Sequence, residues 1–365
     1  MSTKKFIKEK HIAEKFFTDK IVDICPVGHG NINYTHIVTL EKPDGIKHRA
    51  ILQKINNGIF PDVDALMGNI YSITEYLRKK LLPRHDPARC VMTVVKTLDG
   101  RLYTQYGDEF YRCYVMVENT ISYQKVESAE DFYYCGVAFA DFQRVLLNYP
   151  VSTLRPAVKD YHNTIVRYND FIKATENNKA GRKALVEKEI EFYQSRKDIA
   201  SLIMDKINSK TIPMRLVHND AKPNNLLFDT ESNKPICVID FDTVSLGAAC
   251  FDFGDAIRFA GTRQSADSGG LSVDLSLFEA YTKGYLSIAK AFLTKEEIDT
   301  LAVSALVITY ECGMRFLADY LDGDVHFRTG YPHHNLDRTR NHITLVKDIE
   351  QKLPQLEQIV LKYAQ

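Results

Sequence analysis

The chain has 365 residues, of which 47 lysines and arginines balance 47 aspartates and glutamates, and 45% are hydrophobic. This composition is typical of globular proteins and excludes an extensively disordered chain. A formal net charge of zero also argues against a nucleic-acid partner, because proteins that bind nucleic acids usually carry a basic excess.

The seven cysteines are odd in number and scattered, with no Cys-x-x-Cys pair. This pattern favours reduced thiols over a disulfide framework or a zinc ribbon. Residues 1–20 lack the apolar core of a secretory signal. The longest apolar stretch, near residues 301–308, is far shorter than the ~20 residues that a membrane-spanning helix needs. We therefore expect a soluble, cytoplasmic protein with no membrane partner, whose oligomeric state the sequence leaves open.

The first part of the chain is predicted to be rich in β-structure. After an amphipathic helix within residues 1–20, β-branched and aromatic runs bounded by turn residues predict strands at 21–27, 34–40, 48–55, 91–98, 101–106 and 110–117. Apolar residues at helical spacing predict one helix at residues 62–80. A mostly antiparallel sheet with a single long helix follows from this order.

The remainder of the chain is predicted to be mainly helical. Helical spacing appears at residues 131–147, 180–207, 275–292, 295–321 and 337–351, with a strand–loop–strand block at 215–242. We therefore predict an α+β fold with two lobes. Residues 1–118 would form a small β-rich lobe that binds nucleotide, and residues 119–365 a larger, mainly helical lobe that carries catalysis and the acceptor.

The most informative segment runs from His218 to Asn225 and continues to Asp240. Asp220 lies where an apolar strand gives way to a loop, Asn225 follows five residues later, and Asp240 ends the next apolar strand. Because strand–turn–strand returns the chain on itself, these three side chains can converge on one point.

That set of side chains suits phosphoryl transfer. Mg²⁺ prefers oxygen ligands, which Asn225 and Asp240 can supply together with phosphate oxygens. An acceptor hydroxyl needs a carboxylate to orient it and take its proton, which Asp220 can provide. The spacing His-x-Asp-x-x-x-x-Asn followed by Asp corresponds to a kinase catalytic loop and its metal-binding aspartate. A single Asp at a strand end is usually a turn former or a cap, but three groups in this order favour a kinase site.

These motifs, together with residues 238–243 and 251–255, resemble the aminoglycoside phosphotransferase/choline kinase superfamily, which has a protein-kinase-like fold. Within it, residues 52–56 and 335–340 resemble the N-acetylhexosamine 1-kinases. Members of that subfamily transfer the γ-phosphate of ATP to the anomeric hydroxyl of GlcNAc or GalNAc. The resemblance implies ATP and Mg²⁺ as cofactors, Asp220 as catalytic base, and Asn225 and Asp240 as metal ligands.

The resemblance also implies supporting roles around this loop. Asp252 and Asp255 would brace it through backbone N–H groups and Arg258. Asp242 would either support the metal ligands or cap a helix. Lys222 would either neutralise the migrating phosphoryl group or be an ordinary solvated lysine.

The nucleotide site has weaker signals. The loop at 28–33 resembles the phosphate-covering loop of the superfamily, although a plain hairpin turn has the same composition. At the position where a kinase strand carries a Lys or Arg toward the phosphates stands Gln53, followed by Lys54. Neighbouring strand residues face opposite ways, so only one of Gln53 and Lys54 can point at the phosphates. If Gln53 does, the usual positive charge is missing there. The usual ion pair between that charge and a helix glutamate, for which Glu75 is the candidate, is then missing too. The predicted nucleotide-binding residues are Gly28, Gly30, Asn31, Asn33, Gln53, Met116 and Glu118, the last two from an adenine-binding hinge.

The acceptor site would be built by the helical part of the chain. Arg315 and residues 327–340 are candidates, because a neutral sugar needs forked hydrogen-bond donors. A helix-surface salt bridge is the other reading of Arg315. Two other functions stay open: a kinase of another small acceptor, such as an aminoglycoside, choline or an amino acid, and a non-catalytic kinase-like module that binds nucleotide.

Overall fold

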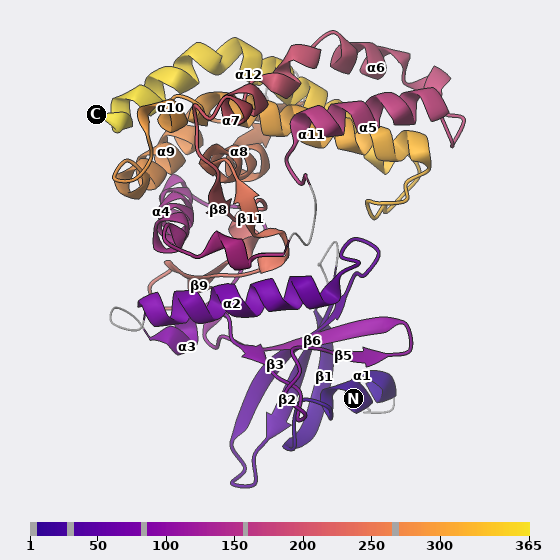
Figure 1. Cartoon of the computed structure of the whole chain (residues 1–365), viewed down its shortest axis with the longest axis vertical. Coiled ribbons are helices and arrows are strands. Elements are labelled where there is room, and N and C mark those ends of the chain that lie inside the picture. Colours follow the sequence, from indigo (N-terminus) through magenta and orange to yellow (C-terminus); the bar gives the residue numbers. More distant parts are fainter. Residues whose placement is uncertain (1–5, 28–32, 82–85, 156–159, 265–269) are drawn as a thin grey trace. The chain divides into compact units, whose positions relative to one another are not determined.

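The computed structural model describes residues 6–27, 33–81, 86–155, 160–264 and 270–365. The chain forms two compact units (Figure 1). Unit 1 comprises residues 1–120, 149–159 and 237–242, and unit 2 comprises residues 121–148, 160–236 and 243–365. The predicted α+β class is confirmed. The assignment of residues 1–118 to nucleotide binding and 119–365 to catalysis stays a prediction.

Unit 1 is built on an antiparallel sheet with the strand order β1-β2-β3-β6-β4, in which β5 also pairs with β6. Its helices are α1 (Ile7–Ala13), α2 (Val63–Leu81) and α3 (Pro87–Cys90). Its strands are β1 (Lys20–Val27), β2 (Tyr34–Glu41), β3 (Lys47–Ile55), β4 (Val94–Val95), β5 (Thr104–Tyr106) and β6 (Glu109–Val115).

The two faces of this sheet have different characters. On one face, α1 packs into an apolar core with alternate strand residues such as Leu52 and Cys113. Because side chains alternate along a strand, their neighbours Gln53 and Arg112 face the other way. These two are register partners across β3 and β6. The face away from α1 therefore carries a polar pair at its centre.

Unit 2 is mainly helical (Figure 1). Helix α4 packs against α9, while α11 packs against α12, α8 and α5. At Gly254, an added Cβ would lie 2.5 Å from the Ser304 carbonyl oxygen, so only glycine permits the close approach of α8 to α11. The helices of the unit are α4 (Ala129–Leu146), α5 (Thr164–Asn177), α6 (Glu187–Gln194), α7 (Met204–Asn208), α8 (Ala249–Ala260), α9 (Leu275–Ala289), α10 (Lys295–Ile298), α11 (Leu301–Asp322) and α12 (His334–Ala364).

Short strands connect these helices. Strands β8 (Arg215–Val217) and β11 (Ser245–Gly247) pair antiparallel, as do β12 (Thr262–Gln264) and β13 (Leu271–Val273). Strands β9 (Leu226–Asp229), β10 (Pro235–Val238) and β7 (Thr120–Ile121) form a sheet of order β10-β9-β7. The paired strands β8 and β11 flank the predicted catalytic segment, since β8 ends just before His218 and β11 begins after Asp240.

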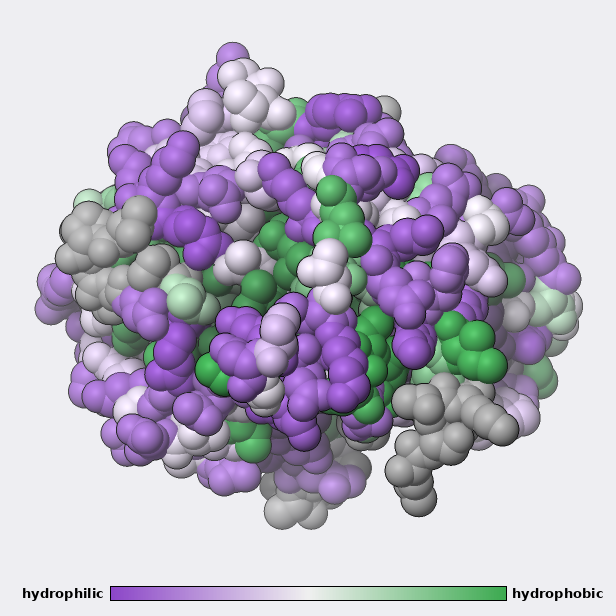
Figure 2. Space-filling model, turned by 90° about the horizontal axis from the view of Figure 1, so that it is seen from below, coloured by the Kyte–Doolittle hydropathy of each residue, from purple (hydrophilic) through white to green (hydrophobic). Residues whose placement is uncertain are grey.

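Helix α11 contains the apolar stretch that was expected to be too short for a membrane span. Among the helices of the described residues, it alone meets the length and composition of such a span, and 72% of its apolar window is buried inside the structure. Its buried residues lie on several sides of the helix, as expected for the central helix of a folded unit. On the face shown in Figure 2, hydrophilic residues predominate and hydrophobic ones form small separate groups.

Several predicted elements need correction. The helix predicted at 180–207 is wrong: the segment contains α6, α7 and short 3₁₀ turns, because Asn178 and Gly181 take positive φ angles and the chain turns again after Gln194. The helix predicted at 295–321 is divided into α10 and α11, and the strand predicted at 91–98 is reduced to β4. Helix α5 was not predicted, and α12 extends well beyond residue 351.

Candidate active site

The predicted catalytic loop begins directly after β8. His218 and Asn219 are buried, and their backbone N–H groups donate to the Asp252 carboxylate at 3.0 and 2.7 Å. Asn219 takes a left-handed conformation with φ 62°, which is uncommon for a residue other than glycine. The Thr243 hydroxyl donates to the His218 carbonyl oxygen at 2.8 Å. The bracing role predicted for Asp252 is therefore confirmed.

Asp220 lies at the end of this braced segment with two polar partners. Its carboxylate is 2.7 Å from Lys222 Nζ and accepts a hydrogen bond from Asn225 Nδ2 at 2.9 Å. Asn225 Nδ2 also donates to the Asp220 backbone oxygen at 2.8 Å. Burial alone would raise the pKa of Asp220, but Lys222 and these hydrogen bonds outweigh it and hold the pKa below its ordinary value. Asp220 is thus an ionised carboxylate at neutral pH.

Lys222 is not an ordinary solvated lysine. Its ammonium group reaches Asp220 and lies 5.6 Å from the centre of the Phe259 ring. Burial opposes its charge, yet Asp220 and Asp255 together raise the pKa of Lys222. Asp255 is itself paired with Arg258 at 2.6 Å, as predicted. A fixed cation therefore lies beside the carboxylate.

The charges of Asp220 and Arg315 both act on Tyr161. Burial, followed by the charge of Asp220, raises the pKa of Tyr161. The Arg315 guanidinium carbon lies 5.5 Å from the Tyr161 ring centre and 5.7 Å from that of Phe327. Arg315 also lies 3.4 Å from Glu311 on the preceding turn of α11. Arg315 is thus held between aromatic rings and has the helix salt bridge as well.

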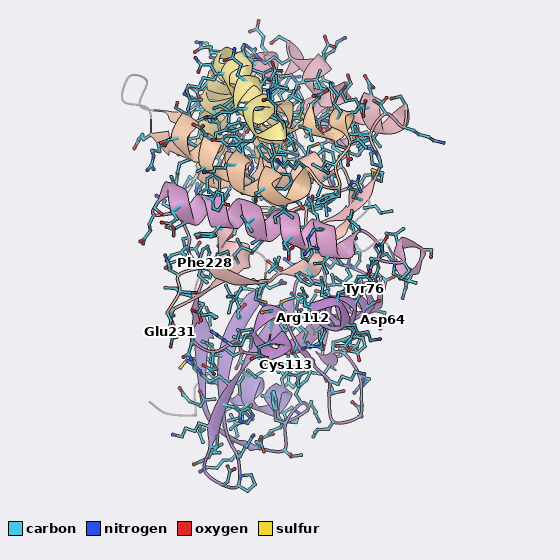
Figure 3. The ribbon with its side chains drawn as sticks, turned by 90° about the vertical axis from the view of Figure 1, so that its left-hand side faces the viewer. Asp64, Tyr76, Arg112, Cys113, Phe228 and Glu231 are labelled. Atoms are coloured by element: carbon cyan, nitrogen blue, oxygen red, sulfur yellow. The ribbon has the colours of Figure 1, made fainter. Side chains whose placement is uncertain are left out.

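In unit 1, the segment that follows β10 carries the other predicted carboxylates. Asp240 takes φ 65°, a left-handed conformation at the point where the strand ends. Asp242 is buried and forms a two-pronged ion pair with Arg112, at 2.5 and 2.9 Å. Figure 3 labels Arg112 next to Cys113, its neighbour on β6. Asn33 Nδ2 donates to the same Asp242 carboxylate at 2.9 Å. These contacts fit the supporting role rather than a helix cap.

Gln53 and Lys54 face opposite sides of the sheet. Gln53 Oε1 accepts a hydrogen bond from Arg112 Nε at 3.1 Å, whereas Lys54 Nζ lies 2.7 Å from Glu109 on the α1 side. Gln53 therefore shares a face with the Asp242 ion pair. Glu75, the predicted partner of a strand cation, instead lies 3.4 Å from Arg78 on its own helix. The buried cation of this face comes from β6, through Arg112.

The other predicted nucleotide contacts stay predictions. Gly28, Gly30 and Asn31 lie outside the described residues. The Met116 N–H donates to the Arg49 carbonyl at 3.1 Å, and the Glu118 carbonyl accepts from Arg89 at 3.2 Å. Both hinge groups thus have partners within unit 1.

The two predicted metal ligands belong to different units, Asn225 to unit 2 and Asp240 to unit 1. Within the described ranges, no three His, Cys, Asp or Glu side chains gather closely enough to hold a metal ion. The predicted ligands are one amide and one carboxylate, whose oxygens suit Mg²⁺ in combination with phosphate oxygens. Asn225 directs its amide nitrogen to Asp220, which leaves the amide oxygen as its metal-binding atom.

Sequence reasoning missed Arg112, Tyr161 and the buried pair His162–Glu311, whose ring nitrogen and carboxylate lie 3.0 Å apart. Arg112 had a signal, since a charged residue between aromatic and apolar neighbours in a strand is rarely buried without a partner. The others carried no motif, because their roles arise from contacts between segments far apart in the chain.

The chain matches a known protein family over most of its length, and its fold resembles those of solved proteins. Residues 23–290 match the model of the phosphotransferase enzyme family, APH. A microcompartment-associated aminopropanol kinase is 16% identical, with a TM-score of 0.65 over 95% of this chain and 98% of that chain. An aminoglycoside phosphotransferase from Alicyclobacillus acidocaldarius is 14% identical, with a TM-score of 0.60 over 97% and 96%. The amicoumacin kinase hAmiN, solved in complex with AMP-PNP, Ca²⁺ and Ami, is 12% identical, with a TM-score of 0.58 over 97% of both chains.

The structural likenesses are too low in identity to show more than a shared fold, but the family match covers more than half of the chain. The chain therefore belongs to the APH phosphotransferase enzyme family and is a small-molecule phosphotransferase of that family.

Proposed function

We propose that the protein transfers the γ-phosphate of Mg·ATP to the anomeric hydroxyl of an N-acetylhexosamine, GlcNAc or GalNAc. The observation that carries the proposal is the Asp220 carboxylate, ionised beside Lys222. Its charge also acts on Tyr161, which lies next to Arg315. The acceptor oxygen forms a bond to the γ-phosphorus while the bond from that phosphorus to the ADP oxygen breaks. Asp220 orients the hydroxyl and takes its proton.

Lys222 and the metal ligands would serve the phosphoryl group. Lys222 contributes positive charge next to the site of transfer, where the migrating group carries negative charge. Asn225 and Asp240 would hold Mg²⁺, which neutralises the phosphates. The AMP-PNP and Ca²⁺ in the solved amicoumacin kinase support a nucleotide and a divalent cation here.

Charge around Asp220 favours a neutral acceptor over a cationic one. Of the unit 2 carboxylates that act on Lys222 or Arg315, Asp255 is paired with Arg258, and Glu311 with His162 and Arg315. A cationic acceptor would meet Lys222 and Arg315 while these carboxylates are already paired. A sugar hydroxyl, by contrast, can accept from the forked donors of Arg315. The charges at the site therefore favour a sugar over a cationic amine as the acceptor.

An amino alcohol or aminoglycoside acceptor is the second candidate, because solved proteins of similar fold are kinases or phosphotransferases of such compounds. A screen of ATP consumption over GlcNAc, GalNAc, aminopropanol, choline and kanamycin separates the two. We expect turnover with the N-acetylhexosamines. Turnover confined to the amines would overturn the sugar proposal and leave the kinase chemistry standing.

Asp240→Asn is expected to weaken Mg²⁺-dependent nucleotide binding, because an amide oxygen lacks the charge that binds the metal. Isothermal titration with Mg·ADP should show a dissociation constant at least about tenfold higher, corresponding to 1.4 kcal/mol. Asp108→Asn, an exposed change in the same unit, is the control. Equal affinity of Asp240→Asn and the wild type for Mg·ADP would remove Asp240 from the metal site.

A further inference from the structure

His162 is a buried histidine held between two oxygens of unit 2. It lies just before α5, and only 8% of the residue is exposed. Its Nδ1 is 3.0 Å from Glu311 Oε1 on α11, and its Nε2 is 3.0 Å from the Asn219 carbonyl oxygen. The ring thus links the central helix to the catalytic loop.

Both partners of the ring are hydrogen-bond acceptors. A backbone carbonyl only accepts, and so does an ionised carboxylate. A neutral imidazole has one N–H and would face one of these oxygens with a lone pair. Only the imidazolium, which donates from both nitrogens, satisfies both contacts. With Glu311 ionised, both ring nitrogens must therefore carry a proton.

The surrounding charges agree with this state. Burial alone would lower the pKa of His162, but the charge and hydrogen bond of Glu311 outweigh it and raise the pKa above 6.5. Burial likewise opposes the charge of Glu311, yet His162 and then Arg315 lower the pKa of this carboxyl. The pair is thus held as imidazolium and carboxylate.

The Asn219 carbonyl immediately precedes Asp220. Asn219 has φ 62°, and its other groups are occupied: the N–H by Asp252, and the side-chain amide by the Thr243 carbonyl and the Ser245 hydroxyl. His162 completes this set at the carbonyl. A strained backbone persists only where its surroundings fix it, so His162 helps to determine where the peptide that leads into Asp220 lies.

On its other side, the pair reaches the acceptor candidate. Glu311 Oε1 contacts both His162 at 3.0 Å and Arg315 at 3.4 Å, whereas the buried Oε2 has no hydrogen-bond partner in the described residues. A change in the position or charge of the His162 ring would therefore alter the contacts of Arg315, through Glu311, as well as those of the catalytic loop.

We propose that His162, held as an imidazolium between Glu311 and the Asn219 carbonyl, is a positioning residue that sets the catalytic loop relative to Arg315. Its kinetic test rests on the proposed kinase function. A phosphoryl transfer depends on the alignment of base, acceptor and phosphorus, and a displacement of about 1 Å can cost on the order of 100-fold in rate.

The proposal gives a pH dependence with a definite sign. The charge of Asp255 also favours the protonated His162 ring, whereas the charge of Arg315 opposes it. Arg167 helps to lower the pKa of Glu311. The rings of Tyr161 and Phe251 pack against the His162 ring. Because the pKa is raised on folding, the stabilisation by the pair is fully present below pH 6.5 and is lost as the pH rises through the higher folded-state value. We expect kcat to fall over the same interval.

The protonation state can be measured without any acceptor. In the full chain labelled with [¹⁵N]histidine, long-range ¹⁵N–¹H spectra at pH 7 should show His162 with both ring nitrogens protonated, its signals being assigned by their loss in His162→Gln. A spectrum of a neutral tautomer would overturn the imidazolium. This measurement needs no acceptor. A neutral His162 ring would therefore contradict the imidazolium without bearing on the proposed function.

Kinetics with the acceptor that the screen identifies test the positioning role. His162→Ala should lower kcat on the order of 100-fold, with a smaller change in the KM for ATP. The double variant His162→Gln/Glu311→Gln can keep the chain of hydrogen bonds without charges, since one amide can donate to the Asn219 carbonyl and accept from the other. It should recover most of kcat and lose the alkaline fall. His11→Gln, at an exposed histidine, is the control.

Either of two kinetic outcomes contradicts the positioning role. One is a His162→Ala protein that retains wild-type kcat. The other is a double variant whose kcat falls with pH as the wild type does. If His162→Ala does not fold, as judged by its thermal transition, the double variant and the NMR spectrum decide the question.

Discussion

Asp220→Asn is expected to lower kcat by about 10²–10⁴-fold while the affinity for Mg·ATP changes little. The substitution keeps the shape of the side chain and removes the charge that orients the acceptor hydroxyl and takes its proton. Lys222, 2.7 Å from the carboxylate, would lose its charged partner. The neighbouring Asn225 can still donate to the new amide oxygen, so the loop has no reason to collapse.

Single-turnover quench experiments with saturating acceptor measure this loss directly, and titration calorimetry with ADP measures binding. Asp205→Asn, at an exposed aspartate of the same unit, should leave both unchanged. Near wild-type turnover by Asp220→Asn would remove this carboxylate from the mechanism. A loss of folding would instead show as a lower thermal transition, which the Asp205 variant should not share.

Arg112→Met is expected to lower the free energy of unfolding of unit 1 by about 3–5 kcal/mol, because it leaves the Asp242 carboxylate buried without its cation. The Arg112 side chain is 1% exposed and makes both bonds of the ion pair, together with a contact to Gln53. Asp242 lies two residues after Asp240, so loss of this anchor should also weaken Mg²⁺-dependent nucleotide binding.

Urea denaturation, followed by a probe in unit 1, measures the change in stability. Arg49→Met is the matched control, since Arg49 is also a strand arginine paired with a carboxylate, Glu118, but both side chains are more than 40% exposed. Its loss should cost about 0–1 kcal/mol. The double variant Arg112→Met/Asp242→Asn should recover much of the stability, because no buried charge is left alone. Equal losses for Arg112→Met and Arg49→Met would contradict the anchoring role.

The parts of the structure that the sequence predicted well depend on local patterns. Apolar, β-branched and aromatic runs bounded by turn residues placed β1, β2, β3 and β6 to within a residue or two, and helical spacing placed α2 and α4. The spacing from His218 to Asn225 predicts that Asp220 and Asn225 converge, and the two side chains are in contact in the structure. In each case the signal lies within one continuous segment of the chain.

The parts that the sequence did not reveal depend on contacts between distant segments. Arg112 meets Asp242 across 130 positions, and His162 meets Glu311 across 149. Neither pair has a periodicity or a motif, since burial decides their energies and burial is a property of the fold. The helix predicted at 180–207 is wrong for a local reason: positive φ angles at Asn178 and Gly181 turn the chain at the start of the segment, and it turns again after Gln194.

The most direct test of the central claim is to incubate the wild-type protein with ATP, Mg²⁺ and N-acetylglucosamine and to record ³¹P and ¹H NMR spectra of the product. We predict a sugar monophosphate whose phosphorus is coupled to the anomeric proton, formed together with ADP in equal amount. Absence of this product from N-acetylglucosamine and N-acetylgalactosamine, with ATP consumed on an amine acceptor in the same assay, would contradict the claim.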